Sequence, residues 1–226
     1  MISRWLQVFG LNGSLRVRFS QYGEDVILHK IFKKPVGFYI DVGAHHPFRQ
    51  SNTAYLWCAG WNGINIDANP KSIEIFNKVR KTDENVWAAI VSDEDAAHKT
   101  HIDLICSETR ELDLGASVSE TIASERSASR RISVPTKSLT QIVNGVKHPT
   151  IDYMNIDIEG VDFEAILGMS SWSKLPKVLS IETYQKNVRD ILSSQVNQQL
   201  ESFGYELKYH IGLTSIYVQS DFDSTH

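Results

Sequence analysis

The sequence predicts an α/β fold with a mostly parallel seven-stranded sheet whose final strand is antiparallel. Short β-rich runs alternate with amphipathic helical stretches, which is the pattern of a parallel sheet covered by helices. The last two β-rich runs, residues 205–209 and 215–219, are joined by only five residues. So short a link permits an antiparallel hairpin but not a helical crossover. At 226 residues and 42% hydrophobic, the chain has the composition of one globular domain.

Each expected element follows from its local pattern. Apolar residues recur at helical spacing over 73–79, after the start signal Asn69-Pro70, and again over 161–169, after Gly160. Both stretches are predicted crossover helices. The runs expected to form the seven strands are residues 37–42, 63–67, 86–91, 151–158, 178–181, 205–209 and 215–219.

Charge and composition exclude several classes of partner. The formal net charge of −4 provides no field that would attract nucleic acid or an anionic membrane. No stretch approaches the roughly 20 apolar residues of a membrane span. Cys58 and Cys106 lack metal-ligand or redox spacing, and residues 1–6 lack the apolar run of a signal peptide. We therefore expect a cytoplasmic protein that binds no nucleic acid and does not span a membrane.

The expected organisation is an N-terminal extension, residues 1–19, followed by one domain over residues 20–226. Apolar side chains near residues 5–9 favour a short helix packed on the domain over a surface anchor. Residues 98–135 break the alternation, because they are rich in Ser, Thr, Glu and Arg. Long segments of this kind are either disordered or functional. This polar insertion is therefore expected to be mobile, either as a lid over the ligand edge or as plain disorder.

The first strand leads into a tight turn that contains Asp41, Gly43, His45 and Pro47. The carboxyl edge of a parallel sheet is where open α/β folds bind ligands, and glycine lets the backbone approach a ligand closely. A dinucleotide fingerprint would require further glycines where His45 and Pro47 stand. The turn therefore favours an adenosine cofactor without a pyrophosphate, such as S-adenosylmethionine.

Two later strand ends extend the predicted cofactor site. Asp67 lies 24 residues after Gly43 (67 − 43), where a carboxylate can accept both ribose hydroxyls of an adenosine. Capping of the helix after Asn69-Pro70 is the alternative role for Asp67. Ser92 and Asp93, after the third strand, are candidates for the adenine edge, with an ordinary turn as the alternative.

Acidic residues at two further strand ends are the candidate catalytic groups. Asp157 and Glu159 stand two apart, so they point the same way if the strand continues, and Glu182 ends the next strand. These acids can hold the amino group of a cofactor, accept the proton of an acceptor hydroxyl, or bind a divalent ion, with Asp157 and Glu182 as the candidate ligands. Glu159 can instead cap a helix. His45 is a further candidate base, and of the adjacent His45 and His46 one is expected to be structural, because neighbouring side chains diverge.

The motifs that carry these residues resemble those of the FkbM family of methyltransferases. The resemblance implies the Rossmann-like class I methyltransferase fold, oxygen methylation, and an S-adenosylmethionine site built on Asp41, Gly43, Asp67 and Asp157. Many family members carry Asn at the position of His45 and Glu at that of Asp67. The matching segments are residues 20–25, 37–47, 51–53, 60–70 and 156–162.

The matching segments also contain further candidate cofactor contacts, namely Gln21, Ala44, Asn52 and Ala68. Because the known acceptors of the family range over sugars and macrolide-type natural products, we expect a small-molecule acceptor, a sugar or a glycosylated metabolite. Neither the need for a metal nor the oligomeric state follows from the sequence. The alternative functions are a nucleotide-dependent oxidoreductase on the same type of sheet and a non-catalytic methyltransferase-like interaction protein.

Overall fold

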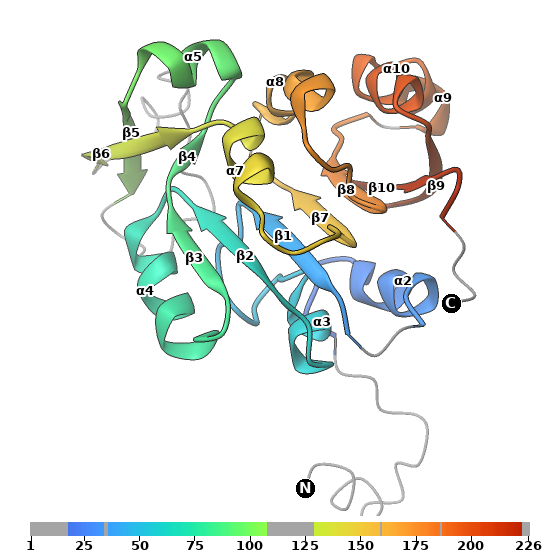
Figure 1. Cartoon of the computed structure of the whole chain (residues 1–226), viewed down its shortest axis with the longest axis horizontal. Helices are drawn as coiled ribbons and strands as arrows, with labels where there is room; N and C mark the ends of the chain where they lie inside the picture. The colour runs from blue at the N-terminus through green and yellow to red at the C-terminus, as the bar shows by residue number, and fades with distance from the viewer. Residues whose placement is uncertain (1–17, 34–35, 108–128, 159, 186, 223–226) are drawn as a thin grey trace, which may run out of the picture.

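A computed structural model describes residues 18–33, 36–107, 129–158, 160–185 and 187–222. The strands of its main sheet are β1 (Phe38–Val42), β2 (Asn62–Asp67), β3 (Glu84–Trp87), β7 (Tyr153–Ile156), β8 (Val178–Glu182), β9 (Tyr205–Ile211) and β10 (Thr214–Gln219). They follow the order β3-β2-β1-β7-β8-β10-β9 (Figure 1). The first five in this order pair in parallel, whereas β10 is antiparallel to both of its neighbours. The predicted fold class is therefore confirmed.

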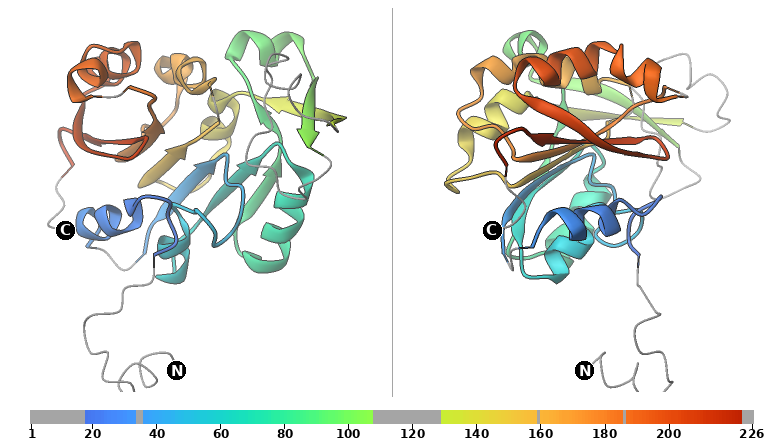
Figure 2. Two further views of the ribbon diagram at one scale, coloured as in Figure 1. Left: turned by 180° about the vertical axis from the view of Figure 1, so that it is seen from behind. Right: turned by 90° about the vertical axis from the view of Figure 1, so that its right-hand side faces the viewer.

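Helices cover both faces of this sheet, as the edge-on view in Figure 2 shows. One face carries α2 (Glu24–Ile31), α3 (Ala54–Cys58) and α4 (Pro70–Val79), and the other carries α7 (Leu139–Gly145), α8 (Asp162–Ile166) with the 3-10 helix η1 (Leu167–Ser171), and α10 (Gln195–Ser202). Successive residues of β1 point to opposite faces, so buried Tyr39 joins the core under α2, while buried Ile40 joins the core under α7. Two short helices, α5 (Asp93–His98) and α9 (Val188–Leu192), complete the set among the described residues.

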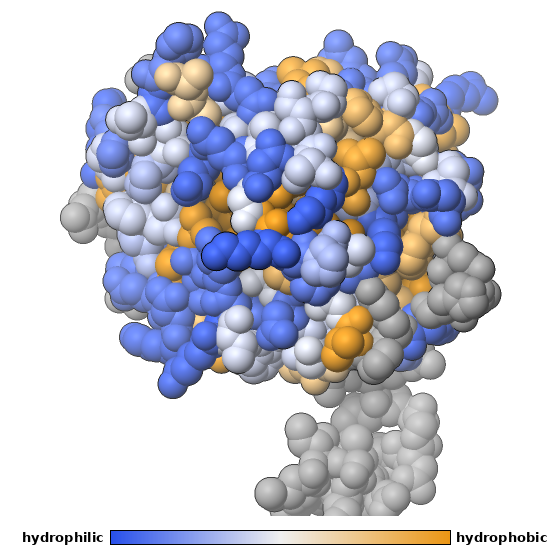
Figure 3. Space-filling view, in the orientation of Figure 1, coloured by the Kyte–Doolittle hydropathy of each residue, from blue (hydrophilic) through white to orange (hydrophobic). Residues whose placement is uncertain are grey.

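The two crossover helices form where the sequence predicts them. At the start of α4, the Asn69 side chain accepts the N–H of Lys71 at 3.0 Å, and Pro70 occupies the first helical position. The apolar pattern over residues 161–169 forms α8 and then tightens into η1. None of the described helices is long and apolar enough to cross a membrane. On the face seen in Figure 3, hydrophobic side chains occur in separate areas among hydrophilic ones.

The third predicted strand is interrupted. Residues 86–91 were expected to be one strand, but β3 ends at Trp87, and β4 (Ala89–Ile90) pairs in parallel with β6 (Ser129–Lys137) in a separate sheet. The Trp87 indole donates a hydrogen bond to the Ala68 carbonyl at 2.9 Å. Residues 89–90 can leave the main sheet because β6 provides hydrogen-bond partners for their backbone groups.

The polar insertion at 98–135 differs from its prediction at both ends. β5 (His101–Ser107) pairs antiparallel with β6, so these residues form a hairpin rather than an irregular loop. The reason is a period-2 apolar pattern that buries Leu104 and Val134 against Ala89. Residues 108–128, to which the choice between a lid and disorder applies, lie outside the described residues, as do residues 1–17 of the predicted N-terminal extension.

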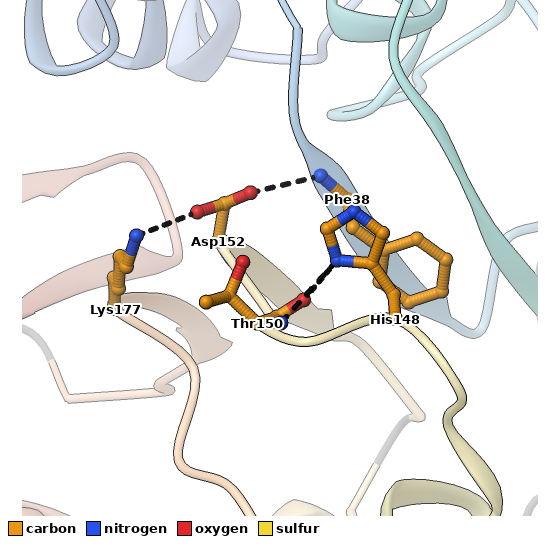
Figure 4. A network of polar contacts seen from close by, with 5 residues as sticks. All are labelled: Phe38, His148, Thr150, Asp152 and Lys177. Atoms are coloured by element: carbon orange, nitrogen blue, oxygen red, sulfur yellow. Dashed lines mark hydrogen bonds and ion pairs between the residues drawn. The ribbon is translucent and has the colours of Figure 1, made fainter.

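At the edge of the sheet opposite the carboxyl ends of its parallel strands, the buried carboxylate of Asp152 connects the segments that begin β1, β7 and β8 (Figure 4). The fully buried Asp152 accepts the N–H of Phe38 through Oδ2 and the Lys177 ammonium through Oδ1, both at 3.0 Å. The Phe38 ring stacks on His148 with centroids 4.8 Å apart, and Thr150 contacts Nδ1 of the same imidazole. Asp152 thus fixes the relative position of the segments that begin β1, β7 and β8, which in turn aligns their carboxyl ends.

Candidate active site

A cavity of about 280 Å³ lies across the carboxyl ends of four adjacent strands. Its lining includes Asp67 at the end of β2, Gly43 after β1, Asp157 after β7 and Glu182 at the end of β8. The order of these strands in the sheet is β2-β1-β7-β8. The cavity therefore follows the sheet edge where parallel α/β folds bind ligands, close to the size of small-molecule pockets.

Gly43 makes the tight turn at the centre of this edge possible. The N–H groups of Gly43 and Ala44 donate to the Ile66 carbonyl at 2.9 and 3.0 Å, and Gly43 has a φ of 77°. A Cβ at this position would lie 1.8 Å from the Asp157 carbonyl oxygen. Only glycine fits, which brings the backbone after β1 and the backbone after β7 together at the cavity.

Asp67 lines the cavity and also holds the turn in place. Its Oδ2 accepts the N–H of His45 and its Oδ1 accepts the N–H of Asn69, both at 2.7 Å. Each oxygen retains a second lone pair for a ligand. Burial raises the pKa of Asp67 to about 6. The predicted ribose contact and the alternative role near the start of α4 are thus compatible, because one carboxylate can serve both. Ala68 lines the cavity beside it, as expected.

The two adjacent histidines have different surroundings. His45 lines the cavity with a φ of 53°, in the left-handed region that Asn also tolerates. Burial, together with the positive charges of His46 and Arg49, lowers the pKa of His45 to about 4, so its imidazole is neutral and only weakly basic. The Nδ1 atom of His46 accepts the N–H groups of Phe48 and Arg49 at 3.0 Å. His46 therefore supports the turn, and His45 is the histidine at the site.

Asp41 and Asn52, both predicted as cofactor contacts, do not line the cavity. Asp41 is buried, and its oxygens accept the Thr53 hydroxyl at 2.5 Å and the Asn155 amide at 3.0 Å. Asn52 donates to Asn155 at 2.9 Å. Ala44 is also buried and outside the lining. The structure places Asp41 and Asn52 in a polar layer that supports the Gly43 turn.

Sequence reasoning missed the centre of this layer, Arg80. Its guanidinium is fully buried, and Nη1 donates to the hydroxyls of Tyr39 at 3.0 Å and of Thr53 at 2.8 Å. Nη2 donates to the Pro47 carbonyl at 2.5 Å and to the Ser51 hydroxyl at 3.2 Å. Arg80 thereby joins the end of α4 to the loop that follows the Gly43 turn. No local pattern distinguishes it from an exposed helix-terminal arginine.

Ser92 and Asp93, the candidates for the adenine edge, lie away from the cavity lining. The Ser92 hydroxyl caps α5 by accepting the N–H of Asp95 at 3.1 Å, and Asp93 accepts the Thr140 hydroxyl at 2.8 Å. In the structure these two residues form the start of α5, with Ser92 as its N-cap and Asp93 as its first residue. The lining near Asp67 instead comes from residues 88–90 and Leu104, which form an apolar surface suited to the face of a purine. Leu104 was missed because it belongs to the insertion.

The acidic groups at the next strand ends are brought together only in part. Asp157 and Glu182 both line the cavity, and Glu182 accepts the Tyr184 hydroxyl at 2.6 Å. Glu159 lies outside the described residues. Within the part of the chain that the structure describes, no three His, Cys, Asp or Glu side chains are grouped as a metal site. Asp162 accepts the N–H groups of Ile158 and Gly160, both at 3.1 Å, and so shapes the turn that leads from Asp157 into α8.

The chain is similar to one protein family and to solved structures of methyltransferases. The sequence matches the family described as the Methyltransferase FkbM domain over residues 41–207, most of the chain. No curated protein matches it. A solved structure of a TehB-like SAM-dependent methyltransferase from Corynebacterium glutamicum is similar over 97% of this chain and 96% of its own, with 11% identity and a TM-score of 0.45. A precorrin-6y C5,15-methyltransferase from Geobacter metallireducens is similar over 87% of this chain and 86% of its own, with 13% identity and a TM-score of 0.42.

Proposed function

The chain belongs to the FkbM methyltransferase family, and from that premise we propose that it methylates a hydroxyl oxygen of a sugar or related small metabolite. Its methyl donor is S-adenosylmethionine. The observation that carries the proposal is the cavity along the sheet edge, with Asp67 towards one end, Glu182 towards the other, and the Gly43 turn between them.

The described residues fit this donor. The carboxylate of Asp67 can accept two ribose hydroxyls, and residues 88–90 with Leu104 offer an apolar surface to the adenine. The Cβ-free turn at Gly43 allows close approach of a ligand to the backbone. When bound, S-adenosylmethionine supplies an electrophilic methyl group on a positively charged sulfur. The carboxylates of Asp157 and Glu182 complement that charge.

Asp157 is our candidate for the residue that handles the acceptor proton. It follows β7, which lies beside β1 in the sheet, and it lines the cavity between the ribose end and Glu182. His45 is the other candidate, and its pKa of about 4 leaves the imidazole neutral, with a basicity similar to that of an ordinary carboxylate. Most of the acceleration in such a site comes from holding the acceptor oxygen about 3 Å from the methyl carbon, in line with the bond that breaks.

The cofactor part of the proposal is tested by thermal unfolding with ligands. S-adenosylhomocysteine should raise the melting temperature, whereas NAD should not, because only a ligand that binds the folded state stabilises it. The opposite result would favour the oxidoreductase alternative. Asp67→Ala should weaken binding by about 1–3 kcal/mol, since two ribose hydroxyls lose a charged acceptor.

The catalytic part is tested by turnover with a labelled methyl donor and a small-metabolite extract. We propose a metal-free scheme, in which turnover is unchanged by EDTA. Loss of turnover that magnesium or manganese restores would instead assign Asp157 and Glu182 to a metal ion. Asp157→Asn should lower turnover more than Glu159→Gln, and near-normal turnover of Asp157→Asn would remove it from the catalytic assignment.

We also propose that the protein acts in the cytoplasm. Cys58 is an exposed free thiol, which is typical of a reducing compartment.

A further inference from the structure

The cavity continues past Asp157 to the end of β8. Three strand spacings separate β2, which ends at Asp67, from β8, which ends at Glu182. At about 4.8 Å per spacing, the two carboxylates lie at positions roughly 14 Å apart along the edge. Gln21 and Leu213 join Glu182 in the lining. Gln21 is a candidate cofactor contact from the sequence, but its connection through Tyr22 to the turn between β9 and β10 favours the acceptor end of the cavity. We refer to Gln21, Glu182 and Leu213 as the acceptor wall.

Two distant parts of the chain meet in the acceptor wall. Gln21 precedes α2, and Leu213 lies in the turn between β9 and β10, so both are outside the matched range 41–207. A buried carboxylate joins them, because Glu24 accepts the Thr214 hydroxyl through Oε1 and the N–H of Tyr22 through Oε2, each at 2.9 Å. Glu24 is therefore a positioning residue for the wall.

Close packing further fixes the wall. Gly212 has a φ of 59°, and a Cβ there would lie 2.2 Å from the Tyr22 ring, so the ring packs directly on the hairpin backbone. Tyr22 still exposes 39% of its surface. The amide of Gln21 donates to the Tyr22 hydroxyl at 3.2 Å. On the other side, the Thr183 N–H donates to the Leu213 carbonyl at 2.7 Å and ties this turn to the end of β8. Gln21 and Glu182 are thus held on elements that are tied to one hairpin.

The charge of the lining indicates what the wall can bind. Asp67, Asp157 and Glu182 line the cavity, and the described lining contains neither Lys nor Arg. S-adenosylmethionine brings its own ammonium and sulfonium together with its carboxylate, whereas a phosphate or carboxylate on the acceptor would meet these negative charges without a cation from the described lining. Hydroxyl groups, in contrast, can donate to Glu182 and exchange hydrogen bonds with the Gln21 amide.

We propose that the acceptor wall is the acceptor subsite and that it takes an uncharged, polyhydroxylated molecule while excluding phosphorylated and carboxylated ones. This inference rests on the function proposed above and adds the residues and the charge class of the acceptor. In the reaction, the acceptor oxygen bonds to the methyl carbon, the sulfur keeps the electrons of the broken bond, and the hydroxyl proton passes to a carboxylate or water. Glu182 and Gln21 orient the acceptor.

The charge class is tested with labelled S-adenosylmethionine and a small-molecule cell extract. The reaction products are separated on an anion-exchange resin at neutral pH. We expect label in the fraction that passes both this resin and a cation-exchange resin, because the second resin removes the cationic labelled donor and leaves uncharged compounds. Label that is retained on the resin and released with phosphorylated or carboxylated compounds would overturn the proposal.

The wall residues are tested with Gln21→Ala and Glu182→Gln, and exposed Gln195→Ala on α10 is the matched control. Each wall variant should lower labelling about tenfold or more, as expected for a lost substrate hydrogen bond, while its affinity for S-adenosylhomocysteine stays within about twofold of the wild type. The control should label normally. Equal labelling by the wall variants, or a parallel loss of S-adenosylhomocysteine affinity, would overturn the assignment. Failure of the wild type to bind S-adenosylhomocysteine would instead refute the proposed function itself.

Discussion

Asp67 and His45 are neighbours in the site, and burial shifts their pKa values in opposite directions. Desolvation disfavours the charged form of each group, so it raises the pKa of Asp67 to about 6 and lowers that of His45 to about 4. At neutral pH the carboxylate is charged and the imidazole is not. The charge that a cationic cofactor meets at this turn is therefore that of Asp67.

The raised pKa of Asp67 predicts how cofactor affinity depends on pH. Its folded-state pKa lies above the usual 3.8, so protonation favours the ligand-free protein as the pH falls through about 6. If the ribose hydroxyls donate to the charged carboxylate, the cofactor can bind only after Asp67 loses this proton, so binding weakens at low pH. Calorimetry with S-adenosylhomocysteine should show constant affinity above pH about 7 and a progressive loss below about 6.

The Asp67→Asn variant should bind weakly and lose this pH dependence between about 5 and 7. Exposed Asp103→Asn should retain it. His45 titrates near 4, which is below this range. A wild-type affinity that does not change between about pH 5 and 7 would contradict the assignment of Asp67 to the ribose.

Arg80 is the residue whose loss should matter most outside the cavity. Buried Asp41 contacts Thr53, and buried Asp83 contacts Tyr39, so both acids are one hydroxyl away from the guanidinium. Arg80→Met would leave two buried carboxylates without a nearby cation and should lower the free energy of unfolding by about 3 kcal/mol or more in urea titration. Exposed Arg49→Met should change it by less than about 0.5 kcal/mol. Similar values for the two variants would exclude this role.

Among the secondary-structure elements, strand ends matter more than strand interiors for this site. β1, β2, β7 and β8 each deliver one side chain or turn to the cavity, and their register decides how these groups line up. Tyr39 and Tyr153 are register partners, as are Tyr153 and Val178, so β1, β7 and β8 begin together near Asp152. A change at the amino-terminal edge can therefore weaken the whole sheet.

Asp152→Ala should destabilise the protein without touching the cavity. It leaves the N–H of Phe38 and the ammonium of Lys177 without this carboxylate, which we expect to lower the free energy of unfolding by about 2 kcal/mol. Chemical denaturation measures this loss. Exposed Asp103→Ala, on β5, is the matched control and should be near neutral. A loss no greater than that of the control would show that Asp152 does not fasten the strands.

At the scale of the whole molecule, the segment before β1 and the final hairpin complete the same cavity wall. The N-terminal segment enters α2 beside β10, and the hydrogen bond from Thr214 to Glu24 joins parts of the chain 190 residues apart (Figure 1). The domain is thus closed by a contact between its two ends. Such a contact contributes to stability and also orders the loop that carries Gln21.

Thr214→Val tests this closure with a nearly isosteric change. Loss of the hydroxyl leaves buried Glu24 with one fewer donor and should lower the free energy of unfolding by about 1–2 kcal/mol, which is a few degrees in melting temperature. Exposed Thr82→Val is the control. Because Asp67 and Gly43 are remote from this contact, affinity for S-adenosylhomocysteine should be unchanged in both variants. A variant as stable as the control would argue against closure through Glu24.

Much of this protein is determined by local sequence pattern. The alternation of apolar runs predicts the sheet, and the five-residue link predicts its antiparallel end. The positions of Gly43, Asp67, Asp157 and Glu182 follow as well, because each stands at or just after the carboxyl end of a parallel strand. A periodic pattern of apolar residues lies within a short stretch of the chain, so it can be recognised without knowledge of the tertiary structure.

Tertiary structure alone decided the rest. Asp41 lies two residues before Gly43 but is buried beneath the turn, and Ser92 caps α5 instead of reaching the cavity. The roles of Arg80 and Leu104, and the presence of Gln21 and Leu213 in one cavity lining, could not be inferred, because their partners are distant in the chain. Local periodicity predicts where a strand ends, but the direction and the partner of a side chain depend on which distant segments pack against it.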